Sequence, residues 1–449
     1  STLVNLSVSA SNSDVTLVSD DPASAIKSLC ILQFNANGND FGTLRHVGIG
    51  TENVAGGGKY SATLLQSVDT NDKYKFVVLA NFPNGYGVFQ GMTGKSYAAV
   101  QQACLSEEIT GNLGFDTNNC FPMFGIPKGG TPEVIDETLD LGSVSLVRAV
   151  ARVDIGIGKK DANTNTWSKN GVKFNMTQIQ IWKSGKQYAY MPLEGSFSSA
   201  GGALTITAPS PVGAVATKAY DNTYITSGTY CAEKIYLPEV DLQWGSVYDT
   251  KHTSRLAIIV GGKYNGSQKE TFYRVDFTKN GNTGEQVEYL PLKRNHKYII
   301  TITKALGTGY KSFSEALASY TVMSNLKIRL IHYDRDKVKD VVYNGQYMLG
   351  VGESEVAVTQ YQNNSYAIDV FTDSPGGWKA TVTAGSDWLK FEGGADAASG
   401  VANDDTQLKL KIPYFNNENI GVGRKATVTL TAGRLTHNIE VTQYTIDPG

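Results

Sequence analysis

The stretch Arg294-Asn295-His296-Lys297-Tyr298-Ile299-Ile300-Thr301-Ile302-Thr303 joins a charged turn to a run of β-branched and aromatic residues. Such a run, entered through a polar turn, is typical of a strand in an all-β protein. We therefore predict that it forms an edge or closing strand of a β-sandwich, and not a helix or a catalytic loop.

The composition of the chain fits several β-domains. Its 449 residues suggest about three domains. Hydrophobic residues make up 41% and charged residues 18%, while 47 Gly and 24 Tyr suit strands joined by tight turns. The formal net charge is −2 and no basic block occurs, which argues against nucleic acid or an anionic membrane as partner. No apolar run approaches the roughly 20 residues of a membrane helix.

Hydrophobic patterning divides the chain into domains. The run Val144 to Ile157 is apolar at odd positions and changes character at even ones, as a strand crossing between two sandwiches would. Residues 426–431 and 438–443 alternate between apolar and polar side chains, which predicts a small Ig-like sandwich. One helix is expected over about Ser96 to Ile109. We predict an all-β chain with few short helices, comprising domains 1–147, 148–340 (with a linker) and 341–449.

No catalytic, metal or cofactor motif stands out. The five histidines include no HExxH pair, and no Ser lies in a GxSxG turn. None of the four cysteines forms a CxxC pair, so a zinc ribbon is not expected. Cys104 and Cys120 either form a disulfide or remain thiols, and the sequence leaves both alternatives open. We expect a protein that is not an enzyme and has no cofactor.

Five segments follow one another over the first 300 residues: Leu29 to Phe34, Phe76 to Asn81, Phe121 to Gly125, Leu146 to Val153 and Arg294 to Thr303. In this order they resemble the fimbrillin family of Bacteroidetes, the type V pilins. The resemblance implies two tandem pilin-type sandwiches in a surface fimbrium. The C-terminal domain resembles the BACON module, through Trp378, Asp387-Trp388-Leu389, Arg424 to Val428 and Ile439 to Gln443.

The fimbrillin resemblance implies assembly by β-strand addition, in which a subunit loses its first strand and accepts a strand from the next subunit. The candidate strand is Leu3 to Val8, with Leu3, Leu6 and Val8 marking the groove region. Lys27 is the candidate processing site, although it could equally be a surface residue flanking a strand. An export or lipid-anchor segment is expected upstream of Ser1.

The family's donor strand lies at the C-terminus, where this chain carries an extra domain. We therefore predict a tip or accessory subunit at the outer membrane that partners other pilin subunits and contributes to adhesion to host or bacterial surface glycans or proteins. The alternative is a surface glycan-binding lipoprotein that does not polymerise. An accessory part of a secreted glycosidase is a third hypothesis, which the lack of a paired-carboxylate domain disfavours.

Three aromatic residues are candidate glycan contacts. Trp378, with Trp388, could offer a platform to a sugar or fill the sandwich core, and the core is favoured for Trp388 because it precedes Leu389. Tyr414 and Phe415 precede amide residues in a turn-rich segment, which suits stacking and hydrogen bonding to a glycan as well as anchoring of the loop.

Overall fold

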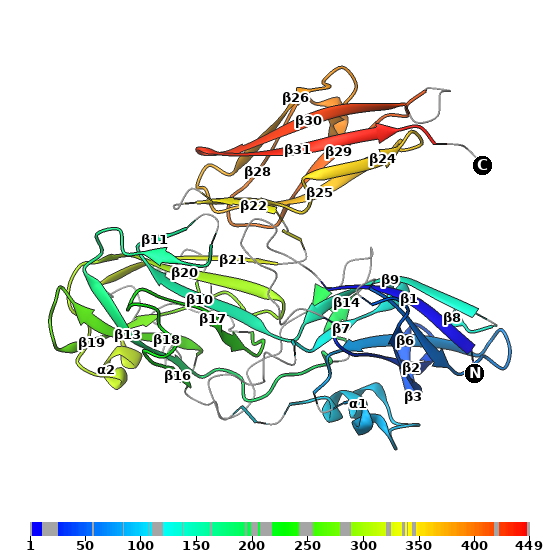
Figure 1. The fold of residues 1–449 in the computed structure, drawn as a ribbon, viewed down its shortest axis with the longest axis horizontal. Coiled ribbons are helices and arrows are strands. Elements are labelled where there is room, and N and C mark those ends of the chain that lie inside the picture. The colour runs from blue at the N-terminus through cyan, green and yellow to red at the C-terminus, as the bar shows by residue number, and fades with distance from the viewer. Residues whose placement is uncertain are drawn as a thin grey trace. The chain divides into compact units, whose positions relative to one another are not determined.

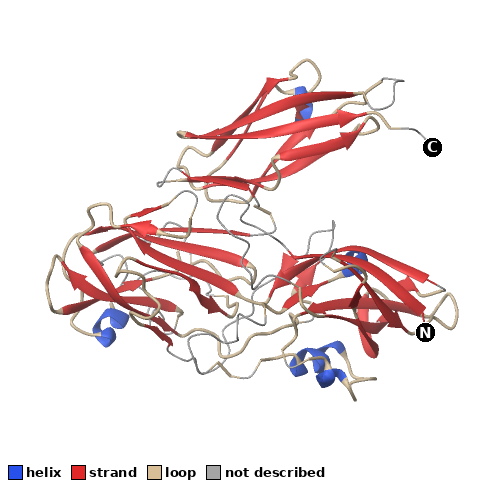
Figure 2. Ribbon diagram, viewed as in Figure 1, coloured by secondary structure: helices blue, strands red, loops and turns tan. Residues whose placement is uncertain are grey.

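The computed structural model describes residues 2–10, 26–55, 58–83, 85–106, 108–109, 120–136, 138–161, 164–193, 195–198, 205–206, 218–241, 255–278, 289–319, 325–334, 337–338, 340–343, 347–416 and 422–446. Strands dominate the described chain and helices are few and short (Figure 2). The predicted all-β class and its β-sandwich architecture are confirmed.

Contacts between residues group the chain into two compact units. The N-terminal unit is Ser1–Asn12, Asp21–Gly158 and Lys169–His332, and the C-terminal unit consists mainly of Tyr333–Gly449. Most residues of the two pilin-type domains predicted from the sequence belong to the N-terminal unit, whereas Lys159–Ser168 and the residues from Tyr333 onward group with the C-terminal unit. The boundaries 147/148 and 340/341 remain predictions.

The first sandwich is a nine-stranded network in the order β3-β2-β6-β7-β9-β1-β5-β4, with β8 beside β6 (Figure 1). Its strands are β1 (Thr2–Ala10), β2 (Leu29–Asn37), β3 (Asp40–Ile49), β4 (Thr51–Glu52), β5 (Lys59–Leu64), β6 (Lys73–Ala80), β7 (Met123–Gly125), β8 (Glu133–Val134) and β9 (Thr138–Arg148). Strand β2 has a core on both faces, since Leu29 and Ile31 join one buried cluster and Cys30 and Leu32 join another. This explains why β2 reads as a continuous apolar run.

The second sandwich packs the sheet β17-β10-β20-β21 against the sheet β16-β13-β18-β19 around one core. Its strands are β10 (Ala151–Ile157), β13 (Phe174–Trp182), β16 (Lys218–Tyr220), β17 (Tyr230–Leu237), β18 (Ala257–Tyr264), β19 (Glu270–Val275), β20 (His296–Ala305) and β21 (Leu326–Asp334). Two short ladders are β11 (Lys159–Lys160) with β12 (Trp167–Ser168) and β14 (Phe197–Ser198) with β15 (Thr205–Ile206). The helix α2 (Phe313–Ala318) is capped by Ser312.

The C-terminal unit packs the sheet β22-β23-β25-β29-β27 against the sheet β24-β31-β30-β26-β28. Its strands are β22 (Asp340–Tyr343), β23 (Met348–Val351), β24 (Glu355–Thr359), β25 (Ser365–Thr372), β26 (Trp378–Ala384), β27 (Lys390–Phe391), β28 (Ala397–Gly400), β29 (Thr406–Lys411), β30 (Gly423–Ala432) and β31 (Leu435–Tyr444). The alternation predicted along β30 and β31 is observed as alternating burial, which gives the sandwich its core.

The stretch that opens with Arg294 is an internal strand and not an edge. Strand β20 runs parallel to β10 on one side and is followed by β21 on the other. The predicted edge position is wrong because β21 adds a further strand beyond it. Strand β21 contributes Leu326, Ile328 and Leu330 to the core.

The predicted crossover consists of two strands and not one. Strand β9 ends at Arg148 in the first sandwich, and β10 begins at Ala151 in the second. The strand is interrupted at Ala149 and Val150. The amide of Ala149 donates to the carbonyl of Pro122 in the first sandwich, whereas the carbonyl of Val150 accepts from the amide of Asn295 in the second.

The predicted helix over Ser96 to Ile109 is shorter than expected. Helix α1 spans Tyr97–Ala103, with the hydroxyl of Ser96 accepting from the amide of Ala99. It ends early because the next residues pair as a strand would: Leu105 forms a bridge with Ala189, and the amide of Ser106 donates to Tyr188.

Candidate functional site

Strand β1 is inserted between two strands of the first sandwich (Figure 1). It pairs antiparallel with β5 from Thr2 to Ser7 and parallel with β9 from Leu3 to Ala10. The ladder to β9 is irregular between Asn5 and Ser7. Because both of its edges are hydrogen-bonded, removing β1 would leave two unpaired strand edges facing each other.

The register of β1 separates the predicted groove residues. The backbone of β1 is described, while its side chains lie outside the described part of the chain. Leu6 stands opposite Tyr60 and Val8 beside Val144, and both partners are buried. Leu3 instead stands between Thr63 and Thr138, which are exposed, so the register does not place Leu3 with the core.

Two further positions of β1 share the register of Leu6 and Val8. Val4 stands opposite the buried Ala62, and Ala10 stands beside the buried Leu146. Sequence reasoning did not single out these two. Their spacing of two residues from Leu6 and Val8 is the signal that could have found them.

Lys27, the predicted processing site, is exposed just before β2. Its backbone amide donates to Oδ1 of Asn81 at 2.8 Å, and the amide of Asn81 donates to the carbonyl of Ser28 at 3.0 Å. The entry to β2 is therefore held by Asn81. A cut after Lys27 would separate β1 from the rest of the chain and leave β2 intact.

The Arg-Asn-His turn before β20 fastens the two sandwiches of the N-terminal unit to each other. Oδ1 of Asn295 accepts from Nη1 of Arg148 at 2.8 Å, and the Asn295 amide donates to the carbonyl of Val150 at 2.8 Å. Arg294 donates through Nε to Glu239 at 2.9 Å and through Nη2 to the carbonyl of Ala189 at 2.7 Å. The motif that first indicated the fold thus has a structural role.

A buried charge cluster lies beside this turn on β10 and β20. Arg152 donates to Asp154 at 2.8 Å and 3.1 Å, and Nζ of Lys297 lies 3.8 Å from the same carboxylate. All three side chains are at most 3% exposed. Burial by itself would raise the pKa of Asp154, but the cations Arg152 and Lys297 outweigh it and lower that pKa to about 2.

Trp378 is part of the core of the C-terminal sandwich and offers no face to a ligand. It is 1% exposed, and its indole nitrogen donates to Thr406 at 2.7 Å. A glycan contact at Trp378 is thus at odds with its burial, and Trp388, for which the core was favoured, is partly buried and packs against the same core. Trp378 is enclosed because it begins β26 opposite Gly400, where the backbone approaches the indole closely.

Trp388 and Phe415 hold Arg424 between them. The guanidinium carbon lies 4.2 Å from the centroid of the Trp388 ring and 4.5 Å from that of Phe415. The guanidinium also donates to Oε1 of Gln443 at 2.8 Å and 3.0 Å. Phe415, a predicted glycan contact, therefore packs on an arginine, while Tyr414 beside it remains 46% exposed.

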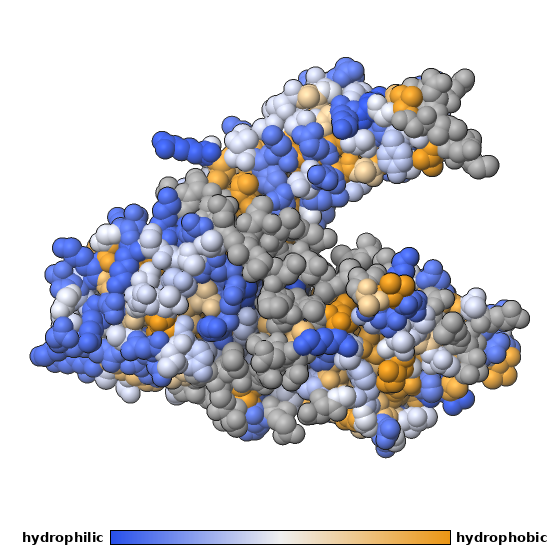
Figure 3. Space-filling model, viewed as in Figure 1, coloured by the Kyte–Doolittle hydropathy of each residue, from blue (hydrophilic) through white to orange (hydrophobic). Residues whose placement is uncertain are grey.

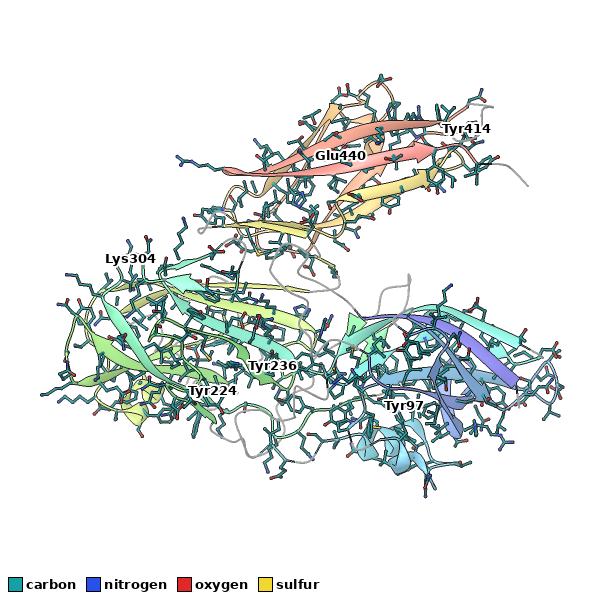
Figure 4. The ribbon with its side chains drawn as sticks, viewed as in Figure 1. Tyr97, Tyr224, Tyr236, Lys304, Tyr414 and Glu440 are labelled. Carbon is teal, nitrogen blue, oxygen red and sulfur yellow. The ribbon has the colours of Figure 1, made fainter. Side chains whose placement is uncertain are left out.

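The predicted glycan contacts do not form one site. Trp378 and its neighbour Lys379 lie at the Thr431 end of β30, whereas Tyr414 lies where β30 begins and β31 ends (Figure 4). At about 3.3 Å per residue these two ends of β30 are about 26 Å apart.

The cysteines and acidic residues provide no redox or metal centre within the described chain. Cys30, Cys104, Cys120 and Cys231 are all buried thiols, so the Cys104–Cys120 disulfide is not formed. No group of histidine, cysteine or acidic side chains suitable for a metal ion occurs among the described residues. None of the helices in the described ranges is long and apolar enough to cross a lipid bilayer.

No protein-family model and no curated protein matches the sequence. Among solved structures, the chain is similar to a fimbrilin from Porphyromonas gingivalis W83, with 15% identity and a TM-score of 0.43 over 74% of this chain and 96% of that one. It is also similar to candidate cell adhesion proteins from Parabacteroides distasonis ATCC 8503 (14% identity, TM-score 0.40, 73% of this chain, 96% of that one) and Bacteroides eggerthii DSM 20697 (14%, 0.39, 74% and 95%). A fimbrilin is the kind of protein that the sequence resemblance predicted.

Proposed function

We propose that the chain is a fimbrial subunit of a Bacteroidetes cell surface, at the tip or in an accessory position, which accepts a strand from another subunit in place of β1. The observation that carries this proposal is the insertion of β1 between β5 and β9, with hydrogen bonds along both of its edges.

Strand replacement at this slot is physically reasonable. Loss of β1 would expose the backbone edges of β5 and β9 and the apolar side chains that line them, among them Tyr60, Ala62 and Leu146. Another strand can bind in such an open slot, because its main chain forms hydrogen bonds with both exposed edges and its alternate side chains fill the exposed core. Processing near Lys27 would make the exchange irreversible, because β1 would no longer be tethered.

The other end of the pilin-type region supports an accepting rather than a donating subunit. In the described residues between β20 and the C-terminal unit, β21 is the strand present, and it is built into its own core through Leu326, Ile328 and Leu330. A compact C-terminal unit then follows. A subunit with this arrangement ends a polymer more readily than it continues one, and displays its C-terminal unit at the cell surface.

A shortened chain tests the proposal. A variant lacking residues 1–27 is mixed with a labelled synthetic peptide of the β1 sequence, and binding is measured by fluorescence anisotropy. We expect binding by the shortened chain and none by the full chain, whose slot is filled. The control peptide carries Val4→Asp, Leu6→Asp and Val8→Asp, which places charge at core-facing register positions.

A second step uses the partner itself. Purified stalk subunit should form a complex with the shortened chain, and the β1 peptide in excess should compete with it. Binding of the peptide without any complex with pilin subunits would contradict the pilus role while retaining the slot. Failure of the correctly folded shortened chain to bind either one would refute strand exchange altogether.

A further inference from the structure

We propose that, once β1 is lost, the hairpin formed by β4 and β5 closes the empty slot by pairing β5 directly with β9. This inference rests on the proposed function, because it describes the slot between the loss of β1 and the arrival of another strand. In the sheet order β1 lies between β5 and β9, antiparallel to β5 and parallel to β9. Strands β5 and β9 therefore run antiparallel to each other and can form an antiparallel ladder.

The outward-facing residues of the two strands are already level with each other. Asn5 of β1 pairs with Ser61 of β5 on one side and with Asp140 of β9 on the other. Neighbouring strands lie about 4.8 Å apart, so the backbones of Ser61 and Asp140 are about 10 Å apart across β1. A sideways movement of β5 by one strand spacing brings Ser61, which is half-buried, opposite the exposed Asp140.

The inward-facing residues match in the same register. Val4 pairs with both Ala62 and Leu139, so the movement brings these two residues opposite each other. The next inward pair of that antiparallel register is Tyr60 with Leu141. Tyr60, Ala62 and Leu141 are buried, and Leu139 packs against the same core. Because the side-chain alternation of both strands is kept, every core-facing residue stays on the core side.

The backbone hydrogen-bonding groups match as well. Along a strand, successive residues turn their N–H and C=O groups alternately to one side and to the other. A β1 residue that bonds to β5 meets a β5 residue turned toward β1, and its two neighbours bond to β9. The β9 residue at the same level is then also turned toward β1. Direct pairing of β5 with β9 therefore recovers hydrogen bonds that the loss of β1 breaks.

The hairpin can move as one piece about two anchored ends. Strand β4 pairs with β5 through Thr51 and Glu52, and this ladder travels with the hairpin. At one end, the amide of Gly50 donates to a carbonyl at the start of β2 at 2.8 Å. At the other end, the side-chain amide of Gln33 exchanges two hydrogen bonds with the backbone of Leu65, at 2.8 and 2.9 Å. The bends needed for closure therefore lie near Gly50 and Leu65.

Burial of apolar surface favours the closed state. On the visible face of the molecule, apolar side chains occur as separate groups among hydrophilic ones (Figure 3). An open slot would instead expose a continuous apolar strip that includes Tyr60, Ala62 and Leu141, which are at most 6% exposed while β1 is in place. Pairing β5 with β9 returns this strip to the core and removes two unpaired strand edges.

Closure covers one part of the slot and leaves the other open. The ladder between β1 and β5 ends at Ser7, whereas β9 continues beside Val8 and Ala10. The buried Val144 and Leu146 of β9 lie in this second part, which β5 does not reach. An incoming strand therefore starts pairing there and displaces β5 from the remainder of the slot.

A pair of engineered cysteines tests the closure. Ser61→Cys and Asp140→Cys are introduced together into the full chain and into the chain lacking residues 1–27. A disulfide needs Cα atoms about 4.4–6.8 Å apart, which the closed slot provides and β1 prevents. In oxidised glutathione we expect a disulfide between positions 61 and 140 in the shortened chain and none in the full chain. The β1 peptide at saturating concentration should slow its formation at least about tenfold.

Thr51→Cys with Ser61→Cys is the matched control. Thr51 already stands opposite Ser61 in the hairpin, so this disulfide should form in both chains and shows that the hairpin is folded. The four natural cysteines are buried, and mass mapping of the linked peptides separates them from the engineered pair. A second sample is cut after Lys27 at an inserted protease sequence in the folded full chain and freed of β1 in mild urea. It should behave like the shortened chain.

The outcomes separate the closure from strand exchange itself. If the control disulfide forms in the shortened chain but the one between positions 61 and 140 does not, closure is refuted, and strand exchange still stands wherever the β1 peptide binds. A disulfide between positions 61 and 140 without any binding of peptide or stalk subunit supports closure and contradicts strand exchange. Equal formation of that disulfide in the full chain would also overturn the inference, because β1 would then not hold the strands apart.

Discussion

Asn295, in the turn that leads into β20, accepts a hydrogen bond from the guanidinium of Arg148, the last residue of β9, at 2.8 Å although 147 positions separate the two. Arg148 is 1% exposed and Asn295 is 3% exposed. The bond joins the last residue of β9 in the first sandwich to the turn before β20 in the second. The connection between β9 and β10 is therefore held in place by buried hydrogen bonds.

We expect Asn295→Ala to destabilise the N-terminal unit by about 2–4 kcal/mol. The change removes an acceptor from a buried guanidinium, and it places alanine at a φ of 61°, which favours asparagine or glycine. Urea unfolding at neutral pH measures the loss. Asn265→Ala is the matched control, since Asn265 has a φ of 49° at an exposed turn and isolates the backbone cost. Equal losses in the two variants would contradict a role for the Arg148 bond.

The buried cluster of Arg152, Asp154 and Lys297 predicts a pH dependence. Because the folded pKa of Asp154 is about 2, below its ordinary 3.8, the folded state stabilises the carboxylate. The stabilisation that the Asp154 carboxylate gives to the folded state is therefore fully present above about pH 4 and is lost as the pH falls toward 2. Urea unfolding of the N-terminal unit across that window should show decreasing stability.

Asp154→Asn should cost about 3–5 kcal/mol at neutral pH, because it removes the buried carboxylate that faces both Arg152 and Lys297 and leaves Arg152 with the partly exposed Glu233 at 3.4 Å. It should also flatten the pH dependence below pH 4. Glu108→Gln serves as control, since Glu108 pairs with Lys186 at the surface and should change stability by less than about 1 kcal/mol. An undiminished slope in Asp154→Asn would show that other carboxylates cause it.

The stacking of Arg424 predicts that charge alone does not replace it. Arg424→Lys keeps the cation but loses the planar contact with Trp388 and Phe415 and the two-fold hydrogen bonding to Gln443. We expect the unfolding temperature of the C-terminal unit to fall, which corresponds to a loss of about 1–2 kcal/mol in its free energy of unfolding. Arg434→Lys, at the exposed turn between β30 and β31, should leave the unfolding temperature unchanged.

The four cysteines should be unreactive in the folded chain. Burial raises the pKa of Cys231 to about 12 and raises the pKa of Cys30 and Cys104 above their ordinary value, so little thiolate forms at neutral pH. A thiol reagent should modify none of them in the native protein and all four after unfolding in urea. Reducing agent should not shift the unfolding temperature; a shift would indicate a disulfide.

The all-β class and the alternating strands β30 and β31 could be predicted from the sequence. The alternation of Ala426, Val428 and Leu430 with threonines recurs as alternating burial along β30. This succeeds because side chains on a strand point to opposite faces with a period of two, so the local sequence carries the information. The segment Arg294 to His296, which carries part of the family resemblance, is held by the buried hydrogen bonds of Arg294 and Asn295.

The contacts between residues far apart in the sequence could not be predicted and became known from the folded structure. The bond between Arg148 and Asn295, the pairing of Tyr361 with Tyr414, and the full burial of Trp378 follow from sheet order and packing. Each depends on which strand lies next to which, and many strands of similar sequence compete for the same neighbours. A periodic pattern predicts whether a side chain is buried or exposed. The residue that the side chain contacts depends on which strands are neighbours in the folded protein.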